Sequence, residues 1–156
     1  EQIENHVVHP LSQFKFACYY GCLNTRIPTL APFDKIEYPM AMDQIIEALG
    51  GESVDWSYKT ECCGAGLGVT AEEISNKMVS QILIDAAAKA VDCIVVACPM
   101  CHVNLDTRQD KIRQQFDIPK AIPVYYVTQL MGLAFGIEEQ QLGIKQNFVP
   151  ALQMEL

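Results

Sequence analysis

The sequence predicts an α/β domain in which helices flank an open, mostly parallel sheet. Apolar runs of strand length occur at 14–20 and 93–97, and segments of helical periodicity lie between and after them. The run CIVVA at 93–97 is apolar at every position, which is typical of a strand buried on both faces of a parallel sheet. Strands that alternate with helices along a chain indicate such a sheet, so we expect a Rossmann-like arrangement.

The first half of the chain is expected to contribute two strands and one helix. Residues 14–20 (FKFACYY) are rich in aromatic side chains and predict a buried strand that a glycine ends. The segment 23–38 contains prolines and no periodic pattern, so we expect a loop there. Residues 40–49 place four apolar side chains on one helical face before a pair of glycines, and 53–57 predict a short strand.

The middle of the chain predicts a glycine-rich loop followed by a long helix. The loop, ECCGAGLGVT, occupies 61–70. Thr70 and Glu73 have the spacing of a capping box, so we expect the helix to begin there and to run to about Val91. Its core-facing stripe is expected to comprise Ile74, Met78, Ile82 and the alanines after Asp85.

The last third of the chain predicts two strands, each followed by a helix. The CIVVA strand leads to Pro99, which suits the first turn of a helix that we expect to continue through Lys111. Residues 123–127 predict a further strand. Thr128 can cap the final helix, which is expected to end near Gly136.

Composition and charge narrow the possible classes of function. The 156 residues suit one ordinary globular domain, because half of them are apolar and 19% are charged. A net charge of −8 argues against a nucleic-acid-binding protein, which requires basic patches. No apolar run approaches the about 20 residues that a membrane-spanning helix requires, and the start of the chain does not resemble a signal peptide. We therefore expect a cytoplasmic protein without a membrane span.

The cysteine content is the exceptional feature of the composition. Seven cysteines in a chain without a secretion signal do not suggest a disulfide scaffold. Five of them follow predicted strands or lie in the glycine-rich loop: Cys22, Cys62, Cys63, Cys98 and Cys101. Because the carboxyl ends of parallel strands meet at one edge of a sheet, three separate segments are expected to bring these five thiols together.

The positions of the five thiols suit the binding of a metal centre. Cys98 and Cys101 lie in the first turn of a predicted helix, where the helix end stabilises thiolates. Cys62 and Cys63 precede Gly64 in a loop whose glycines permit an irregular backbone, leave room for a cluster and expose N–H groups to its sulfides. Five thiolates exceed the four that tetrahedral zinc requires, so they favour an iron–sulfur cluster.

Simpler interpretations of the cysteines remain open. The CxxC at 98–101 is also the pattern of a thioredoxin-like dithiol, and the adjacent pair at 62–63 is compatible with two buried core cysteines. Both pairs together would supply the four ligands of a structural zinc site. Cys18 and Cys93 lie within predicted strands, so we expect them to be small buried apolar side chains.

The order of these motifs resembles the CCG domain, which is the cysteine-rich domain of heterodisulfide reductase. The intervals fit that family, with 39 residues between Cys22 and Cys62 and 34 between Cys63 and Cys98. The similarity runs from about Phe14 to Gly143 and is to the C-terminal half of the reductase subunit that carries the CCG motifs. The segments that carry it are YGC at 20–22, YPMAMDQIIEALG at 38–50, ECCGAG at 61–66, ACPMCHVNLD at 97–106 and VTQLMGLAFG at 127–136.

The resemblance implies a cofactor, a reaction and partners. Members of the family bind a noncubane [4Fe–4S] cluster through five cysteines, and the matching positions here are Cys22, Cys62, Cys63, Cys98 and Cys101, with Gly64 beside them. The implied function is that of an oxidoreductase that cleaves or forms a disulfide at this cluster, with Cys62 and Cys63 at the catalytic centre. Iron–sulfur and flavin subunits are the implied partners, and a small-molecule or protein-bound thiol or disulfide is the implied substrate. Full-length members carry two CCG motifs, so residues 1–156 are expected to be one domain that is the second half of a longer subunit or a stand-alone version of that half.

Other residues near the motifs have two interpretations each. His102 is a candidate proton donor or hydrogen-bond partner of the cluster, or else a solvated histidine in the first helical turn. Arg26 and Lys59 either favour an anionic substrate or are solvated loop residues. The family often has His after the first cysteine, whereas Leu23 and Asn24 follow it here, which leaves the substrate open. The alternative function is a non-catalytic module that carries zinc or an electron-relay cluster and docks a partner.

Overall fold

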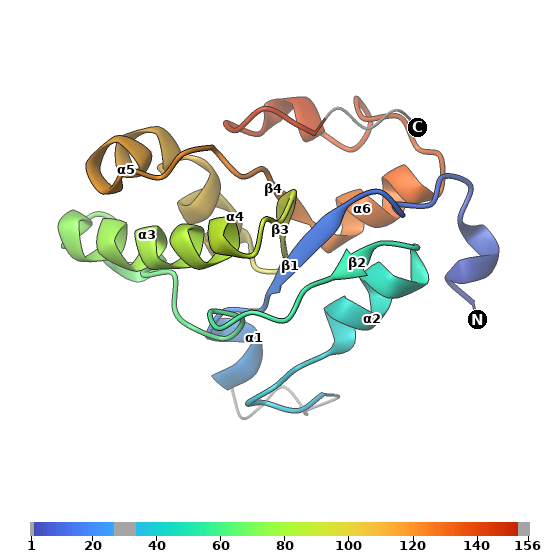
Figure 1. The fold of residues 1–156 in the computed structure, drawn as a ribbon, viewed down its shortest axis with the longest axis horizontal. Helices are drawn as coiled ribbons and strands as arrows, with labels where there is room; N and C mark the ends of the chain where they lie inside the picture. Colours follow the sequence, from blue (N-terminus) through green and yellow to red (C-terminus); the bar gives the residue numbers. More distant parts are fainter. Residues whose placement is uncertain (1, 27–33, 153–156) are drawn as a thin grey trace.

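A four-stranded, fully parallel sheet forms the centre of the molecule, and helices cover both of its faces (Figure 1). The computed structural model describes residues 2–26 and 34–152. In spatial order, the strands are β2 (Glu52–Ser53), β1 (Lys15–Tyr19), β3 (Cys93–Val96) and β4 (Val124–Tyr126). The predicted α/β fold class with an open parallel sheet is therefore confirmed.

Side chains alternate along the strands and so divide the core into two layers. Phe16 and Cys18 of β1 pack beneath α2 (Ala41–Ala48) and α6 (Val127–Ala134). Ala17 and Tyr19 point to the opposite face, where the covering helices are α3 (Glu72–Ala88), α4 (Pro99–Asp106) and α5 (Gln109–Phe116). This period of two is what strand geometry requires, and it gives each face its own hydrophobic cluster.

The strand order places a topological switch point between β1 and β3. From β1 the chain passes to β2 on one side of the sheet, and from β3 it passes to β4 on the other side. In open α/β sheets, ligands bind beyond the carboxyl ends of the strands at such a point. Cys22 follows β1 and Cys98 follows β3, so two of the predicted ligand segments lie on the two sides of it.

The expectations for the first half of the chain are confirmed in outline and corrected in detail. The predicted loop at 23–38 begins with a short helix, α1 (Leu23–Arg26), and residues 27–33 lie outside the described part. β2 contains only two residues, because its last bond to β1 is the one from Val54 N to the Phe16 carbonyl at 2.9 Å. The strand predicted at 53–57 is thus shorter and starts one residue earlier.

The capping box predicted for the long helix is wrong. α3 begins at Glu72, its N-cap is Ala71, and no side chain caps it. Thr70 lies one residue before the N-cap position. The helix face that packs against the core contains Ser75, Val79 and Ile82. As a consequence Ile74, predicted to be buried, is 55% exposed.

The helix predicted from Pro99 through Lys111 is in fact two helices. Pro99 occupies the first turn of α4 as expected, but α4 ends at Asp106 and α5 begins at Gln109. The Thr107 hydroxyl donates to the Val103 carbonyl at 2.8 Å, and a bond of this kind competes with the helical ladder.

The final strand and helix form where the sequence places them. The cap is again different from the prediction, because the N-cap of α6 is Tyr126 rather than Thr128. The Tyr126 N–H donates to the Gln129 side chain at 2.9 Å. None of the helices in the described residues combines the length and the hydrophobicity needed to cross a membrane.

Candidate functional site

The five predicted ligand cysteines lie at the carboxyl edge of the sheet. Two pairs of sulfur atoms are close together: Cys22 Sγ and Cys62 Sγ are 3.6 Å apart, and Cys63 Sγ and Cys101 Sγ are also 3.6 Å apart. Cys98, the N-cap of α4, interacts with Cys101. In Figure 1, α1 and the loop between β2 and α3 lie side by side below the sheet, which is how Cys22 meets Cys62. The predicted convergence of three segments is therefore present in the structure.

The five thiols differ in their access to solvent. All seven cysteines of the chain are free thiols, and Cys63, Cys98 and Cys101 are 3–4% exposed. Cys22 and Cys62 are half-buried, so they form the open side of the group. Within residues 2–26 and 34–152, no three His, Cys, Asp or Glu side chains converge on one point as a single metal ion requires. Four of the five thiols instead form two pairs, and Cys98 interacts with Cys101 of the second pair.

The remaining two cysteines occupy the other face of the sheet. Cys18 and Cys93 are fully buried with α2 and α6, away from the ligand group. Burial raises the pKa of Cys18 to about 12 and that of Cys93 well above its ordinary value. The prediction that both are small buried core side chains is confirmed.

Cys63 is the thiol best suited to ionise. The hydrogen bond from Cys101 lowers the pKa of Cys63 to about 6, against the opposing effect of burial, and the Ala65 N–H and the Asn104 side chain add to the lowering. The same bond raises the pKa of Cys101, because a thiol that donates to a thiolate holds its proton. Burial and the neighbouring Cys62 raise the pKa of Cys22. Within the inner pair, the hydrogen bond therefore favours the thiolate on Cys63 over one on Cys101.

Two glycines allow the backbone to come close to the sulfur atoms. Gly21 has φ +63°, and a Cβ atom there would lie 3.0 Å from Cys101 Sγ and 3.3 Å from the Tyr19 ring. Gly64 has φ +75°, and its N–H donates to Cys62 Sγ at 3.3 Å. Side chains are disfavoured at both positions by conformation and by space.

We expect Gly21→Ala to destabilise the protein by about 1–2 kcal/mol, which is the usual energetic penalty for a side chain in the left-handed region. The new methyl group would also displace Cys101 Sγ, so metal uptake should fall. Gly66→Ala is the matched control, because Gly66 has no atom within 4 Å of the added Cβ. Urea unfolding of both variants measures the difference, and equal stabilities would contradict the expectation.

Two residues that the sequence analysis did not single out, one in α4 and one at the N-cap of α5, bind the glycine-rich loop. Asn104 is buried and donates to the Cys63 carbonyl at 2.8 Å and to Ser75 Oγ at 3.3 Å. Arg108 donates to the Gly68 carbonyl at 2.9 Å. Asn104 follows Cys101 by three residues and so shares its helical face, which is the one signal in the sequence that points to it.

The polar residues predicted near the site have different surroundings from those expected. His102 is 8% exposed, its Nε2 lies 3.1 Å from the Val124 carbonyl, and its ring stacks on Tyr126 at 4.4 Å. Burial lowers its pKa, so the interpretation as a solvated histidine is wrong. Lys59 is also buried, in an ion pair with Asp43, whereas Arg26 is exposed at the end of α1. A catalytic role for His102 stays a prediction.

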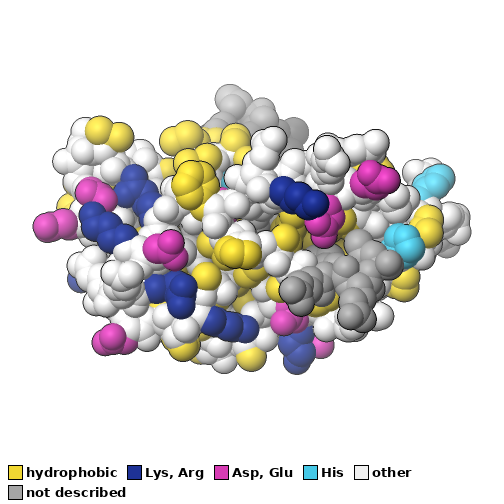
Figure 2. Space-filling view, turned by 90° about the horizontal axis from the view of Figure 1, so that it is seen from above, with side chains coloured by type: hydrophobic (Ala, Val, Ile, Leu, Met, Phe, Trp, Pro, Cys, Tyr) yellow, Lys and Arg dark blue, Asp and Glu magenta, His cyan; other side chains and the backbone are white. Residues whose placement is uncertain are grey.

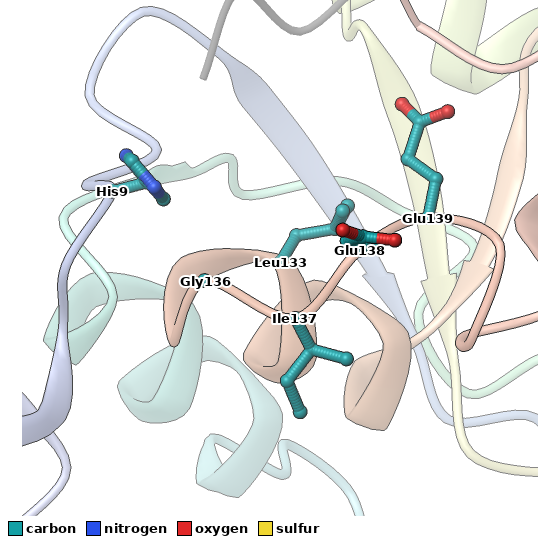
Figure 3. Close-up of a pocket in the computed structure, with 6 residues that line it drawn as sticks. All are labelled: His9, Leu133, Gly136, Ile137, Glu138 and Glu139. Atoms are coloured by element: carbon teal, nitrogen blue, oxygen red, sulfur yellow. The ribbon is translucent and has the colours of Figure 1, made fainter.

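A hollow elsewhere on the molecule contains no cysteine. It has a volume of about 170 Å³ and lies where the N-terminal segment meets the end of α6 (Figure 3). Its lining consists of His9, Leu133, Gly136, Ile137, Glu138 and Glu139. Figure 3 shows His9 well apart from the carboxylate of Glu139, so the polar groups do not converge on a ligand position. The cysteine edge remains the candidate site.

Comparison with known proteins identifies the family of the chain. Residues 16–106 match the cysteine-rich domain family known as CCG. The chain belongs to this family. The matched segment includes all five clustered cysteines, Cys18 and Cys93.

The relatives of this CCG domain include subunits of reductases. The chain is 37% identical over 155 residues to a subunit of the ferredoxin:CoB-CoM heterodisulfide reductase of Methanosarcina mazei, and the match covers 98% of the chain and 51% of that subunit. It is 32% identical to an 8-methylmenaquinol:fumarate reductase membrane anchor subunit of Wolinella succinogenes, with 99% of the chain and 54% of that protein covered. The chain thus spans about half the length of the curated relatives it matches.

One solved structure has the same fold as this domain. The crystal structure of a hypothetical protein from Helicobacter pylori superposes with a TM-score of 0.71 at 10% sequence identity. The match covers 95% of the chain and 26% of that protein. At this identity the likeness concerns the fold alone.

Proposed function

We propose that this CCG domain is the cluster-binding part of a heterodisulfide reductase-like oxidoreductase. In the proposal, Cys22, Cys62, Cys63, Cys98 and Cys101 hold a [4Fe–4S] cluster of the noncubane type. The observation that supports it is the meeting of two sulfur pairs, each 3.6 Å apart, at the switch point of a parallel sheet. The similarity to reductase subunits agrees with it.

The chemistry of the donor set fits an iron–sulfur cluster. All five candidate ligands are thiols, which are the soft ligands that iron–sulfur clusters take. They come from three segments, and four of them form two sulfur pairs while Cys98 interacts with Cys101, an arrangement that suits a centre with several metal atoms better than a single ion. The space that Gly21 leaves beside Cys101 Sγ adds room at the inner pair.

The five cysteines form two sides of the site, which differ in their burial. When bound, such a cluster supplies the electrons that cleave a disulfide or accepts those released when one forms. The buried Cys63, Cys98 and Cys101 form the inner side, which excludes water. Cys22 and Cys62 form the half-buried outer side, from which a sulfur substrate can approach. Cys62 and Cys63, being adjacent in the chain, connect the two sides.

The rest of the reductase is part of the proposal. The chain corresponds to about half of its relatives, so we propose that it acts as the second half of a two-motif subunit. Partner subunits with iron–sulfur and flavin groups would exchange electrons with it, and the substrate would be a thiol or a disulfide.

Lys, Arg, Asp and Glu side chains are interspersed on the surface visible in Figure 2, so that face carries no uniform basic patch for nucleic acid. A cytoplasmic location stays a prediction.

Metal analysis of protein purified without oxygen tests the proposal. We expect a brown protein that contains about four iron atoms and acid-labile sulfide per chain, with an electron paramagnetic resonance signal after oxidation. A colourless protein with one zinc ion would overturn the cluster and favour the non-catalytic module. Addition of a thiol to the oxidised protein should change the resonance signal, and no change would argue against a sulfur substrate.

A further inference from the structure

Tyr19 is a buried phenol held rigidly at the end of β1. Its side chain is fully buried, and its hydroxyl donates to the Glu61 carbonyl at 2.5 Å. Its ring packs at 6.0 Å from the ring of Trp56, whose indole N–H donates to the Cys18 carbonyl at 3.1 Å. Both contacts fix the ring against the sheet, so the phenol has one orientation in the core.

This orientation places the phenol among the clustered thiols. Cys101 Sγ and the Tyr19 ring both border the space that a side chain on Gly21 would fill, at 3.0 and 3.3 Å. The hydroxyl is bound to the carbonyl of Glu61, the residue directly before Cys62 and Cys63, and the phenol helps to lower the pKa of Cys63. The nearby thiols Cys63, Cys101, Cys62 and Cys22 in turn raise the pKa of the Tyr19 phenol, in addition to the larger effect of burial. Tyr19 is thus in electrostatic contact with four of the five candidate ligands.

The hydroxyl has one proton and two possible acceptors. A phenol O–H rotates about its C–O bond, so it can direct the proton to the Glu61 carbonyl or to Cys63 Sγ. A hydrogen bond to a charged sulfur is stronger than one to a neutral carbonyl. The side-chain amide of Asn104 is less free to donate to a ligand sulfur, because it already donates to the Cys63 carbonyl and to Ser75 Oγ.

We propose that the Tyr19 hydroxyl donates a hydrogen bond to Cys63 Sγ of the iron-loaded site and thereby raises the reduction potential of the cluster. The inference rests on the proposed function. A donor stabilises the reduced cluster more than the oxidised one, because reduction adds negative charge that the ligand sulfurs share. Full burial of the phenol strengthens this effect, since no water screens it. Tyr19 is a positioning residue that acts through Cys63.

Tyr19→Phe removes the hydroxyl and keeps the ring. We expect the variant to fold, to retain iron and to have a lower midpoint potential than the parent protein in a dye-mediated titration followed by electron paramagnetic resonance. The matched control is Tyr125→Phe, which removes a buried hydroxyl that accepts a bond from Leu152 N at 2.9 Å on the opposite face of the sheet. Its potential should equal that of the parent. Equal potentials in all three proteins would overturn the role of Tyr19.

A second variant keeps the inference testable if Tyr19→Phe fails to hold iron. Site-specific replacement of Tyr19 by 3-fluorotyrosine makes the phenol a stronger donor with little change in size, so we expect a higher potential. An unchanged or lower potential would overturn the proposal. Failure of the parent protein to bind iron would instead overturn the proposed function, which keeps the two failures distinct.

Discussion

Cys22→Ser is expected to lower the iron that the reconstituted protein retains by more than about tenfold, because loss of a ligand exceeds the effect of a lost outer-shell partner. Cys22 comes from a different segment than its partner Cys62, so its loss leaves one sulfur pair incomplete. A serine hydroxyl does not ionise near neutral pH and is a poor ligand for iron. Iron and sulfide analysis, with the visible spectrum, measures the effect.

The same substitution separates the three interpretations of the cysteines. A zinc site built from the other four thiols would keep its metal, and a dithiol at Cys98 and Cys101 would keep its activity. Only a five-ligand cluster requires Cys22. Full iron retention in the variant would therefore contradict the proposed ligand set.

Cys18→Ser is the matched control for this experiment. Cys18 lies four residues before Cys22 but points to the other face of the sheet. Ser53 Oγ lies 3.7 Å from Cys18 Sγ, so a serine there has a hydrogen-bond partner. We expect this variant to bind iron as the parent does, and a loss equal to that of Cys22→Ser would indicate a general defect in folding.

The convergence of the cysteines was predictable because it follows from strand direction alone. Parallel strands that end at one edge carry the residues after them to that edge, and the apolar runs at 14–20 and 93–97 were long enough to identify. The glycines of the loop after Cys63 indicated an irregular backbone, which Gly64 shows with positive φ, whereas Gly21 was expected only to end the first strand. These signals are local in the sequence.

The features that were missed depend on contacts between distant segments. The division between α4, which ends at Asp106, and α5, which begins at Gln109, is not visible in the sequence, because residues 107 and 108 include neither glycine nor proline. Tyr19 looked like one more aromatic core residue, and its relation to Cys63 requires residues 42 or more positions away. Lys59 looked like a solvated loop cation, because nothing near it in the sequence indicates Asp43 as a partner.

Lys59→Met is expected to destabilise the protein by about 3–5 kcal/mol, the range observed when one partner of a buried ion pair is removed. Lys59 Nζ lies 2.9 Å from Asp43 Oδ1, and the two side chains are 4% and 2% exposed. The variant would leave the Asp43 charge with neutral donors in place of a cation, namely the Tyr20 hydroxyl at 2.7 Å and Ser53 Oγ at 2.6 Å. Urea unfolding of the metal-free protein measures the loss.

The ion pair also supports the segment that leads to Cys22. The Lys59 carbonyl accepts the N–H groups of Tyr20 and Gly21 at 2.8 and 3.3 Å, so iron retention should fall with stability.

Lys15→Met is the matched control, since Lys15 pairs with Glu52 at 3.2 Å but is 49% exposed, and we expect a loss below about 1 kcal/mol. The double variant Lys59→Met with Asp43→Asn should recover part of the loss, because it removes the unpaired charge. Equal losses for Lys59→Met and Lys15→Met would show that burial of the pair contributes nothing to the fold beneath the cysteines.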